Sequence, residues 1–148
     1  MSGGFLCTKQ EVSIIRYSVI YCDCPWEYKV WSKKGQGRSA AHHYDTIPTE
    51  ELCALPVAEI AAPDCVLFMW ATFPNLLDCL KVIKAWRFRY TSCGFVWVKE
   101  NPKSPGYHVG LGYWTRANAE LCLIATRGHP KRISKSVRQL VISPLERH

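Results

Sequence analysis

Short apolar runs, separated by polar segments that carry glycine and proline, set the pattern of this chain of 148 residues. Each run is short and rich in β-branched and aromatic residues, which favours a buried strand over a helix. The predicted strands are 17–23 (YSVIYCD), 64–72 (DCVLFMWAT), 90–99 (YTSCGFVWVK), 118–126 (NAELCLIAT) and 138–143 (RQLVIS).

Two segments between these runs predict helices. Apolar residues recur at helical spacing in 74–86, which opens at Pro74, a residue suited to the first turn of a helix. In 47–63, Thr49 is the predicted N-cap and two glutamates follow it, while Pro56 must interrupt or restart the helix. The polar, glycine-bearing segment 33–46 predicts a loop.

Strands that alternate with helices predict right-handed crossovers and a mostly parallel sheet covered by helices. The predicted fold is therefore α/β, an αβα sandwich in a single domain over residues 1–148. Ligands of open sheets bind beyond the carboxyl ends of the strands. Three segments are expected at such ends: 23–26, 71–75 and 99–108.

Composition indicates the broad class of protein. Hydrophobic residues make up 48 % and charged residues 21 %, a globular balance, and the length is that of one domain. The eight cysteines show no zinc-site spacing, so we expect buried, reduced thiols and no metal. With no signal-peptide pattern at the N-terminus and no apolar run of about 20 residues, the expectation is a soluble, cytoplasmic protein without a membrane partner.

The charge is uneven along the chain. A net charge of +7 favours an anionic partner, most often nucleic acid. Residues 127–145 contain no acidic side chain and include Arg127, His129, Lys131, Arg132, Lys135 and Arg138. Two interpretations stay open for this segment, a solvated basic face and a set of phosphate contacts.

The end of the first predicted strand combines a carboxylate, a tight turn and an indole in Asp23, Cys24, Pro25 and Trp26. A flipped nucleobase offers a flat face for tryptophan and a polar edge for fixed acceptors. The N6 amine of adenine is a poor nucleophile, and acceptors at the Asp23 carboxylate and the Cys24 carbonyl would polarise its N–H bonds. From these four residues alone, the favoured interpretation is that Asp23 caps a turn and Trp26 lies in the core.

Five segments in order resemble the MT-A family of adenine-N6 methyltransferases, whose motif is Asp-Pro-Pro-Trp. They are VIYCDCPWEY (19–28), HHYDTI (42–47), LPVAEIAAPDCVLFMWAT (55–72), LKVIKAWRFRYTSCGFVWVK (80–99) and GLGYWTRANAELCLIATRG (110–128). The resemblance covers roughly residues 17 to 147, and the phage and bacterial DNA adenine methylases of the family are the most similar.

The resemblance implies a Rossmann-like methyltransferase fold, S-adenosyl-L-methionine as the methyl donor and adenine N6 in DNA as the acceptor. By the same resemblance Asp23 binds the target amine and lies near the methionine end of the cofactor, Pro25 holds the turn, and Trp26 stacks on adenine. Tyr44 and Thr46 match a mobile gate over the substrate. Supporting or nucleic-acid-facing positions match Lys99, Tyr113, Trp114, Arg116, Asn118 and Glu120.

Two departures from the family pattern stand out. Cys24 occupies the place of a proline, which keeps the carbonyl but loses the fixed φ of about −65° and predicts a looser turn. The sequence ends at His148, before the segment in which the family places much of its cofactor site. A C-terminally truncated member is expected, with an incomplete sheet, weak cofactor binding and self-association through an open edge.

These departures leave alternatives to the enzyme. One is a catalytically inactive nucleic-acid-binding remnant that keeps the basic face. Another is a regulatory partner of an active methyltransferase, since the family pairs active with inactive subunits. Asp23 and Trp26 favour the enzyme, whereas Cys24 and the early end favour the alternatives.

Overall fold

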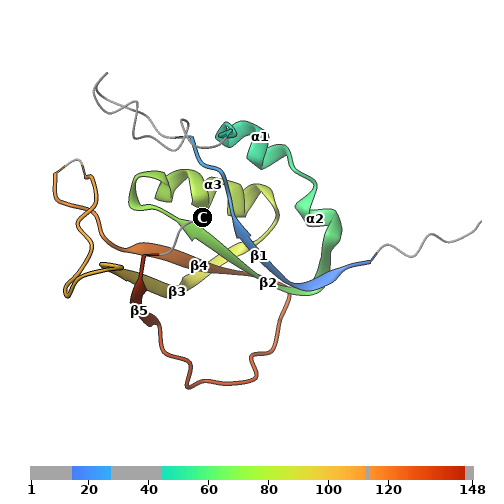
Figure 1. Cartoon of the computed structure of the whole chain (residues 1–148). Helices are drawn as coiled ribbons and strands as arrows, with labels where there is room; N and C mark the ends of the chain where they lie inside the picture. Colours follow the sequence, from blue (N-terminus) through green and yellow to red (C-terminus); the bar gives the residue numbers. More distant parts are fainter. Residues whose placement is uncertain (1–14, 28–44, 113, 146–148) are drawn as a thin grey trace, which may run out of the picture.

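The computed structural model describes residues 15–27, 45–112 and 114–145 (Figure 1). Within these ranges, five strands form one sheet in the order β1-β2-β4-β3-β5. The strands are β1 (Tyr17–Asp23), β2 (Ala61–Ala71), β3 (Arg89–Glu100), β4 (Glu120–Arg127) and β5 (Leu140–Pro144). The helices are α1 (Thr49–Ala54), α2 (Val57–Ile60) and α3 (Leu76–Ala85), with a 3-10 turn over Phe73–Asn75.

All five predicted strands are confirmed, with β2 starting three residues earlier than predicted. Pro56 does interrupt the first helical segment, since α1 ends before it and α2 begins after it. The prediction of Thr49 as N-cap is wrong. Pro48 holds the cap position and Thr49 is already helical, because the carbonyl of Pro48 accepts the first helical bond, from the Leu52 N–H at 3.1 Å.

The sheet is mixed in its pairings and mostly parallel in its directions. β1 pairs with β2 and β3 pairs with β5 in parallel, whereas β4 is antiparallel to both of its neighbours. Of the five described strands, β4 is thus the one that runs backwards. The prediction of crossovers throughout is wrong at this point. The described residues of the connection, 101–112 and 114–119, form no helical crossover but stay at the edge where β3 ends, so β4 starts there and returns.

One face of the sheet carries the core. Alternate residues of β2, namely Cys65, Leu67, Met69 and Ala71, are buried against α1 and α3, as period-two alternation requires. The two helices contact each other there, and the buried Trp86 indole donates from Nε1 to the Leu52 carbonyl at 2.7 Å. Figure 1 shows α1, α2 and α3 on this same side of the sheet.

The opposite face has no helical cover in the part of the chain that the structure describes. Tyr17, Val19 and Tyr21 of β1 are exposed there, 51 %, 55 % and 67 % respectively. The second helical layer of the predicted αβα sandwich is therefore missing from the described residues, and the architecture observed is a helical layer on one mixed sheet. None of the helices in these ranges is long and apolar enough to cross a membrane.

Candidate active site at one edge of the sheet

The strand directions bring the predicted ligand segments to one edge. β1, β2, β3 and β5 end there and β4 begins there, so 23–26, 71–75 and 99–108 share this carboxyl edge. Asp23, exposed at the end of β1, is in register with Trp70 of β2. Neighbouring strands lie about 4.8 Å apart, so roughly 14 Å of sheet separates β1 from β3. Asp23 and Lys99 thus share an edge without being adjacent.

A tight turn follows Asp23. The N–H of Trp26 donates to the carbonyl of Cys24 at 2.8 Å, a three-residue turn centred on Pro25. The Pro25 carbonyl accepts from the N–H of Ile47 at 2.9 Å, which ties the turn to the segment that enters α1. A carbonyl oxygen has two lone pairs, so the Cys24 oxygen keeps one acceptor position.

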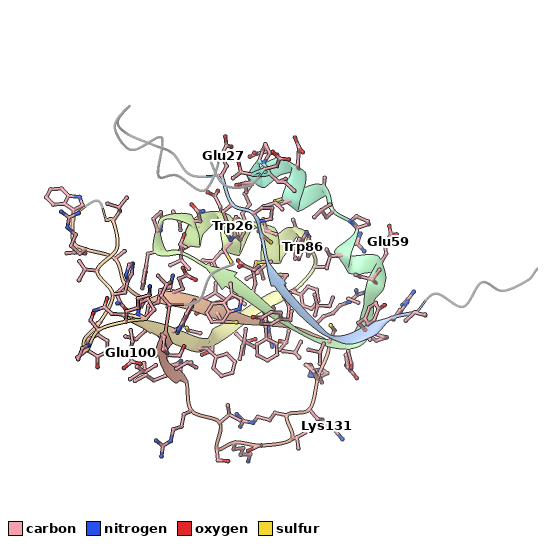
Figure 2. All side chains as sticks on the ribbon, in the orientation of Figure 1. Trp26, Glu27, Glu59, Trp86, Glu100 and Lys131 are labelled. Atoms are coloured by element: carbon pink, nitrogen blue, oxygen red, sulfur yellow. The ribbon has the colours of Figure 1, made fainter. Side chains whose placement is uncertain are left out.

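Trp26 lies in the core and anchors this turn to the sheet. It is 3 % exposed, and its Nε1 donates to the carbonyl of Trp70 at 3.2 Å (Figure 2). The indole thereby joins the end of β1 to the end of β2. A base could stack on Trp26 only if the indole left this position.

Aromatic side chains of the uncovered face reach the same edge. The Nε1 of Trp70 donates to the hydroxyl of Tyr21 at 2.6 Å, and the rings of Trp70 and Trp97 meet edge to face at 6.3 Å between centroids. Trp97 in turn donates from Nε1 to the Ser143 hydroxyl of β5 at 2.8 Å. Sequence analysis assigned these residues to strands and gave them no role in the site. A signal was available, because Tyr21 and Asp23 are two positions apart in a strand and therefore lie on the same face of the sheet.

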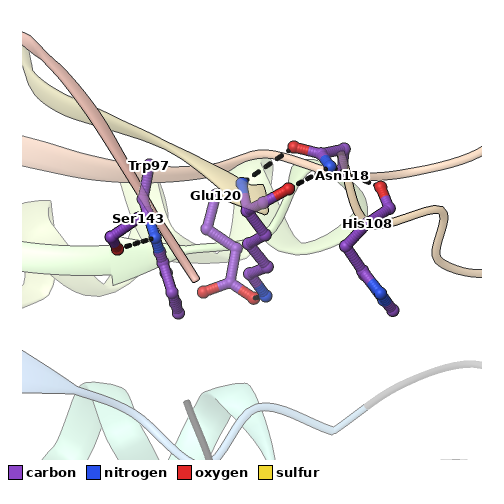
Figure 3. A network of polar contacts seen from close by, with 6 residues as sticks. Trp97, His108, Asn118, Glu120 and Ser143 are labelled. Carbon is purple, nitrogen blue, oxygen red and sulfur yellow. Dashed lines mark hydrogen bonds and ion pairs between the residues drawn. The ribbon is translucent and has the colours of Figure 1, made fainter. Parts of the chain in front are cut away.

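The end of β3 carries a polar network (Figure 3). The Lys99 ammonium pairs with the Glu120 carboxylate and lies 4.8 Å from the centre of the Trp97 ring. Both charged side chains are largely buried, 12 % and 26 % exposed. Asn118 accepts from the Lys99 N–H at 3.0 Å and donates to the carbonyls of Lys99 and His108. Its side chain therefore joins β3, the loop and the start of β4.

A carboxylate at the end of β1, a tight turn behind it and a polar network at the end of β3 thus share the carboxyl edge. The sequence profile of the MT-A70 family matches residues 17–147. The chain belongs to the MT-A70 family. It is 32 % identical over 145 residues to the Type II methyltransferase M.MunI of Mycoplasma sp. That alignment covers 85 % of this chain and 58 % of the relative, so the chain spans little more than half of that protein's length.

The structure describes three of the other residues that the resemblance predicted: Thr46, Trp114 and Arg116. Thr46 is half-buried next to Ile47, one residue from the bond to the Pro25 turn. Arg116 lines a hollow of about 510 Å³ with His108, Val109, Gly110 and Leu111. Trp114 is 91 % exposed on the same loop. Tyr44 and Tyr113 lie outside the described residues.

Asn75 is a residue of this edge that sequence analysis did not single out. It follows β2 in the segment ATFPN and is 5 % exposed. Its amide nitrogen has no hydrogen-bond partner among the described residues, an unusual state for a buried donor. A ligand or water at the carboxyl edge would supply the missing acceptor. The signal in the sequence was a polar residue placed four positions after the end of a buried strand.

The basic segment lies away from Asp23. Because β4 runs backwards, Arg127 is at the amino edge and residues 128–139 connect β4 to β5 from there. Figure 2 places Lys131 on the side of the sheet opposite Trp26 and Trp86. Arg127 donates from Nη1 to the Ala58 carbonyl at 2.6 Å, so it has a structural partner. The exposed cations of the connection are Lys131, Arg132, Lys135 and Arg138.

Proposed function

We propose that this chain transfers the methyl group of S-adenosyl-L-methionine to the N6 amine of adenine in DNA. Membership of the MT-A70 family and the similarity to a Type II methyltransferase support methyl transfer as the reaction class. The observation that carries the proposal is the exposed Asp23 carboxylate at the end of β1, followed by a tight turn that fixes the Cys24 carbonyl beside it.

The chemistry rests on two acceptors. The Asp23 carboxylate accepts one N–H of the adenine amine, and the free lone pair of the Cys24 carbonyl accepts the other. Together they draw the amine away from the plane of the ring, so that its lone pair becomes available for attack on the methyl carbon. Acceptors held in place before the reaction stabilise the developing positive charge at nitrogen.

The same edge offers groups that fit the cofactor. S-adenosyl-L-methionine, when bound, supplies a methyl group on a positively charged sulfur. The Asp23 carboxylate suits the cationic methionine end, and the partnerless amide nitrogen of Asn75 suits an acceptor atom of the ligand. Asp23 is the last residue of β1 and Asn75 follows β2, the neighbouring strand, so both are at the carboxyl edge.

Methylation of an adenine-containing duplex with labelled cofactor tests the proposal. Asp23→Ala should lower the rate by about 10²–10³-fold, the usual effect of losing one preorganised electrostatic contact. Glu59→Gln is the control, because Glu59 is an exposed acid on α2 beside the amino edge. Equal rates for Asp23→Ala and the unmodified chain would reject the role of Asp23. Recovery of the labelled methyl group on cytosine instead of adenine would reject adenine as the methylated base.

A further inference from the structure

Asp23 is flanked by two cysteines. In extended backbone, residues 22 and 24 lie on the same side of β1, opposite to Asp23 and facing the core. Cys24 is 8 % exposed and Cys22 is half-buried, and both pack against the cluster that contains Cys79 of α3. A hydrogen bond between the two thiol groups is the main cause of the pKa shift of each. β1 is an edge strand of the described sheet, so the pair lies on one of its least enclosed strands.

The hydrogen bond makes the two thiols chemically unequal. The Cys22 thiol donates to Cys24 and lowers the pKa of Cys24, although burial and the nearby Asp23 charge act in the opposite direction. The pKa of Cys22 is raised by the same bond and by burial. Burial raises the pKa of Cys79 to about 12 and that of Cys122 to about 11. Cys24 is thus the more acidic of the pair and is better placed than Cys79 or Cys122 to react as a thiolate.

We propose that Cys22 and Cys24 form a reversible disulfide with hydrogen peroxide as the oxidant, and that this bond switches off the site by moving Asp23. The first part concerns the thiols alone. The second part rests on the proposed function, because it requires Asp23 to act in methyl transfer.

The reaction balances with peroxide as the sole oxidant. The Cys24 thiolate attacks one peroxide oxygen, the O–O bond breaks, hydroxide leaves and a sulfenic acid forms at Cys24. The Cys22 sulfur then attacks the Cys24 sulfur, the S–O bond breaks and the disulfide forms. The hydroxide that leaves in this second step takes the Cys22 proton and becomes water, and the hydroxide from the first step becomes water with the proton that Cys24 lost on ionisation. Two thiols and one peroxide thereby give one disulfide and two waters.

The backbone must bend when this bond forms. Two residues of extended strand span about 6.4–6.8 Å between Cα atoms, at the upper end of the range for a disulfide and above its usual distance of about 5.5–6 Å. The strand therefore shortens at the residue between the cysteines, which is Asp23. Its carboxylate leaves the position that the register with Trp70 provides. A proline at position 24, as in the family motif, cannot form this bond.

Peptide mass mapping tests the disulfide directly. Cleavage by trypsin after Arg16 and Lys29 gives one peptide, 17–29, that contains Cys22 and Cys24 and no other cysteine. After brief peroxide treatment and alkylation, this peptide should lose the mass of two hydrogen atoms and take up no alkyl group. Dithiothreitol should reverse both changes. Cys22→Ser should instead accumulate sulfenic acid at Cys24, which a dimedone probe detects.

Methylation is measured on the same samples. Oxidation should lower the rate by about 10²-fold or more, the scale of losing the Asp23 contact, and dithiothreitol should restore it. Cys24→Pro should be insensitive to peroxide relative to its own untreated rate, whereas Cys53→Ser, a change on α1, should respond like the unmodified chain.

Two alkyl groups on peptide 17–29 after treatment would overturn the disulfide, as would a bond from Cys24 to the peptide holding Cys79. A mapped disulfide with an unchanged rate would overturn the switch. If the reduced chain methylates nothing, the proposed function fails while the mapping still decides the disulfide.

Discussion

The side chain of Asn118 binds both backbone polar groups of Lys99, accepting from its N–H at 3.0 Å and donating to its carbonyl at 2.9 Å. An amide side chain thereby takes the place of a neighbouring strand beyond Trp97, the last residue of β3 that pairs with β4. The same amide also donates to the His108 carbonyl. The Asn118 side chain thus binds residues that lie 19 and 10 positions before it in the chain, and it holds them together at the candidate active site.

Replacing Asn118 by Ala should lower the free energy of unfolding by about 1–3 kcal/mol, because the half-buried Lys99 N–H and His108 carbonyl lose the Asn118 amide. The Lys99 carbonyl keeps its bond from the His108 N–H at 2.9 Å. Asn118→Asp should recover only part of this loss, since a carboxylate accepts from the Lys99 N–H but cannot donate to either carbonyl. Urea unfolding measures both variants. Ser104→Ala, an exposed change in the same loop, is the control and should stay close to the unmodified chain.

Local pattern was sufficient to predict the strands but not their directions. Runs such as VLFMW are short, apolar and rich in strand-forming residues, so β2 could be located from its own composition. The reversal of β4 depends on the loop 101–119 staying at one edge, which the distant bonds of Asn118 impose. No periodicity of the loop carries that information.

The candidate site divides in the same way. Asp23 was predicted because a carboxylate at the end of an apolar strand is a local signal. The burial of Trp26 was not, because it depends on a bond to Trp70, 44 residues away. Asn75 and His108 were missed for the same reason, since their importance comes from neighbours in space. Resemblance to a family supplied positions such as Lys99 and Glu120, and only the structure showed that they form an ion pair.

The buried position of Trp26 predicts that this residue stabilises the turn. Trp26→Phe should lower the free energy of unfolding by about 0.5–1.5 kcal/mol, the worth of the lost bond to the Trp70 carbonyl. Affinity for a duplex, corrected for the unfolded fraction, should change little. Trp26→Ala tests the alternative, that the indole stacks on the target base. If it weakened duplex binding by about 1–3 kcal/mol in the folded protein, the indole would be stacking on the base.

The end of α3 contains a strained residue. Arg87 has φ of 64°, and the bonds from Phe88 N–H to the Ile83 carbonyl and from Arg87 N–H to the Lys84 carbonyl form a Schellman cap. The left-handed conformation costs a side-chain-bearing residue about 1–2 kcal/mol, whereas glycine adopts it freely at an entropic cost of about 0.5–1 kcal/mol. Arg87→Gly should therefore stabilise the chain by roughly 0.5–1 kcal/mol. Thermal unfolding of Lys84→Gly, in the last turn of the same helix, should show a loss of about 1 kcal/mol instead.

The pKa of Cys24 predicts the pH dependence of its alkylation. Only the thiolate reacts, so a lowered pKa moves the midpoint of the rate profile below that of an ordinary thiol. In Cys22→Ala the donor to the thiolate is gone, and the midpoint for Cys24 should move to higher pH. Cys79 and Cys122, with pKa values raised to about 12 and about 11, should react only in more alkaline solution. Iodoacetamide labelling with peptide mapping gives each profile, and an unshifted Cys24 in Cys22→Ala would contradict the hydrogen bond.

The position of the basic connection predicts how DNA length affects binding. The eight residues of β4 at about 3.3 Å each place the connection roughly 25 Å from the carboxyl edge, the length of about seven base pairs. If its cations contact phosphates of DNA held at Asp23, they can do so only with a duplex longer than this.

For a duplex of about 20 base pairs, replacing Lys131, Arg132, Lys135 or Arg138 by Gln should each flatten the slope of log affinity against log salt by about one unit. For a duplex of about six base pairs centred on the target adenine, the same changes should leave the slope as it is. Arg116→Gln is the matched control, because Arg116 lines the hollow near the carboxyl edge and should flatten the slope for both lengths. Equal slopes for the four variants and the unmodified chain on the long duplex would assign the basic connection to solvent.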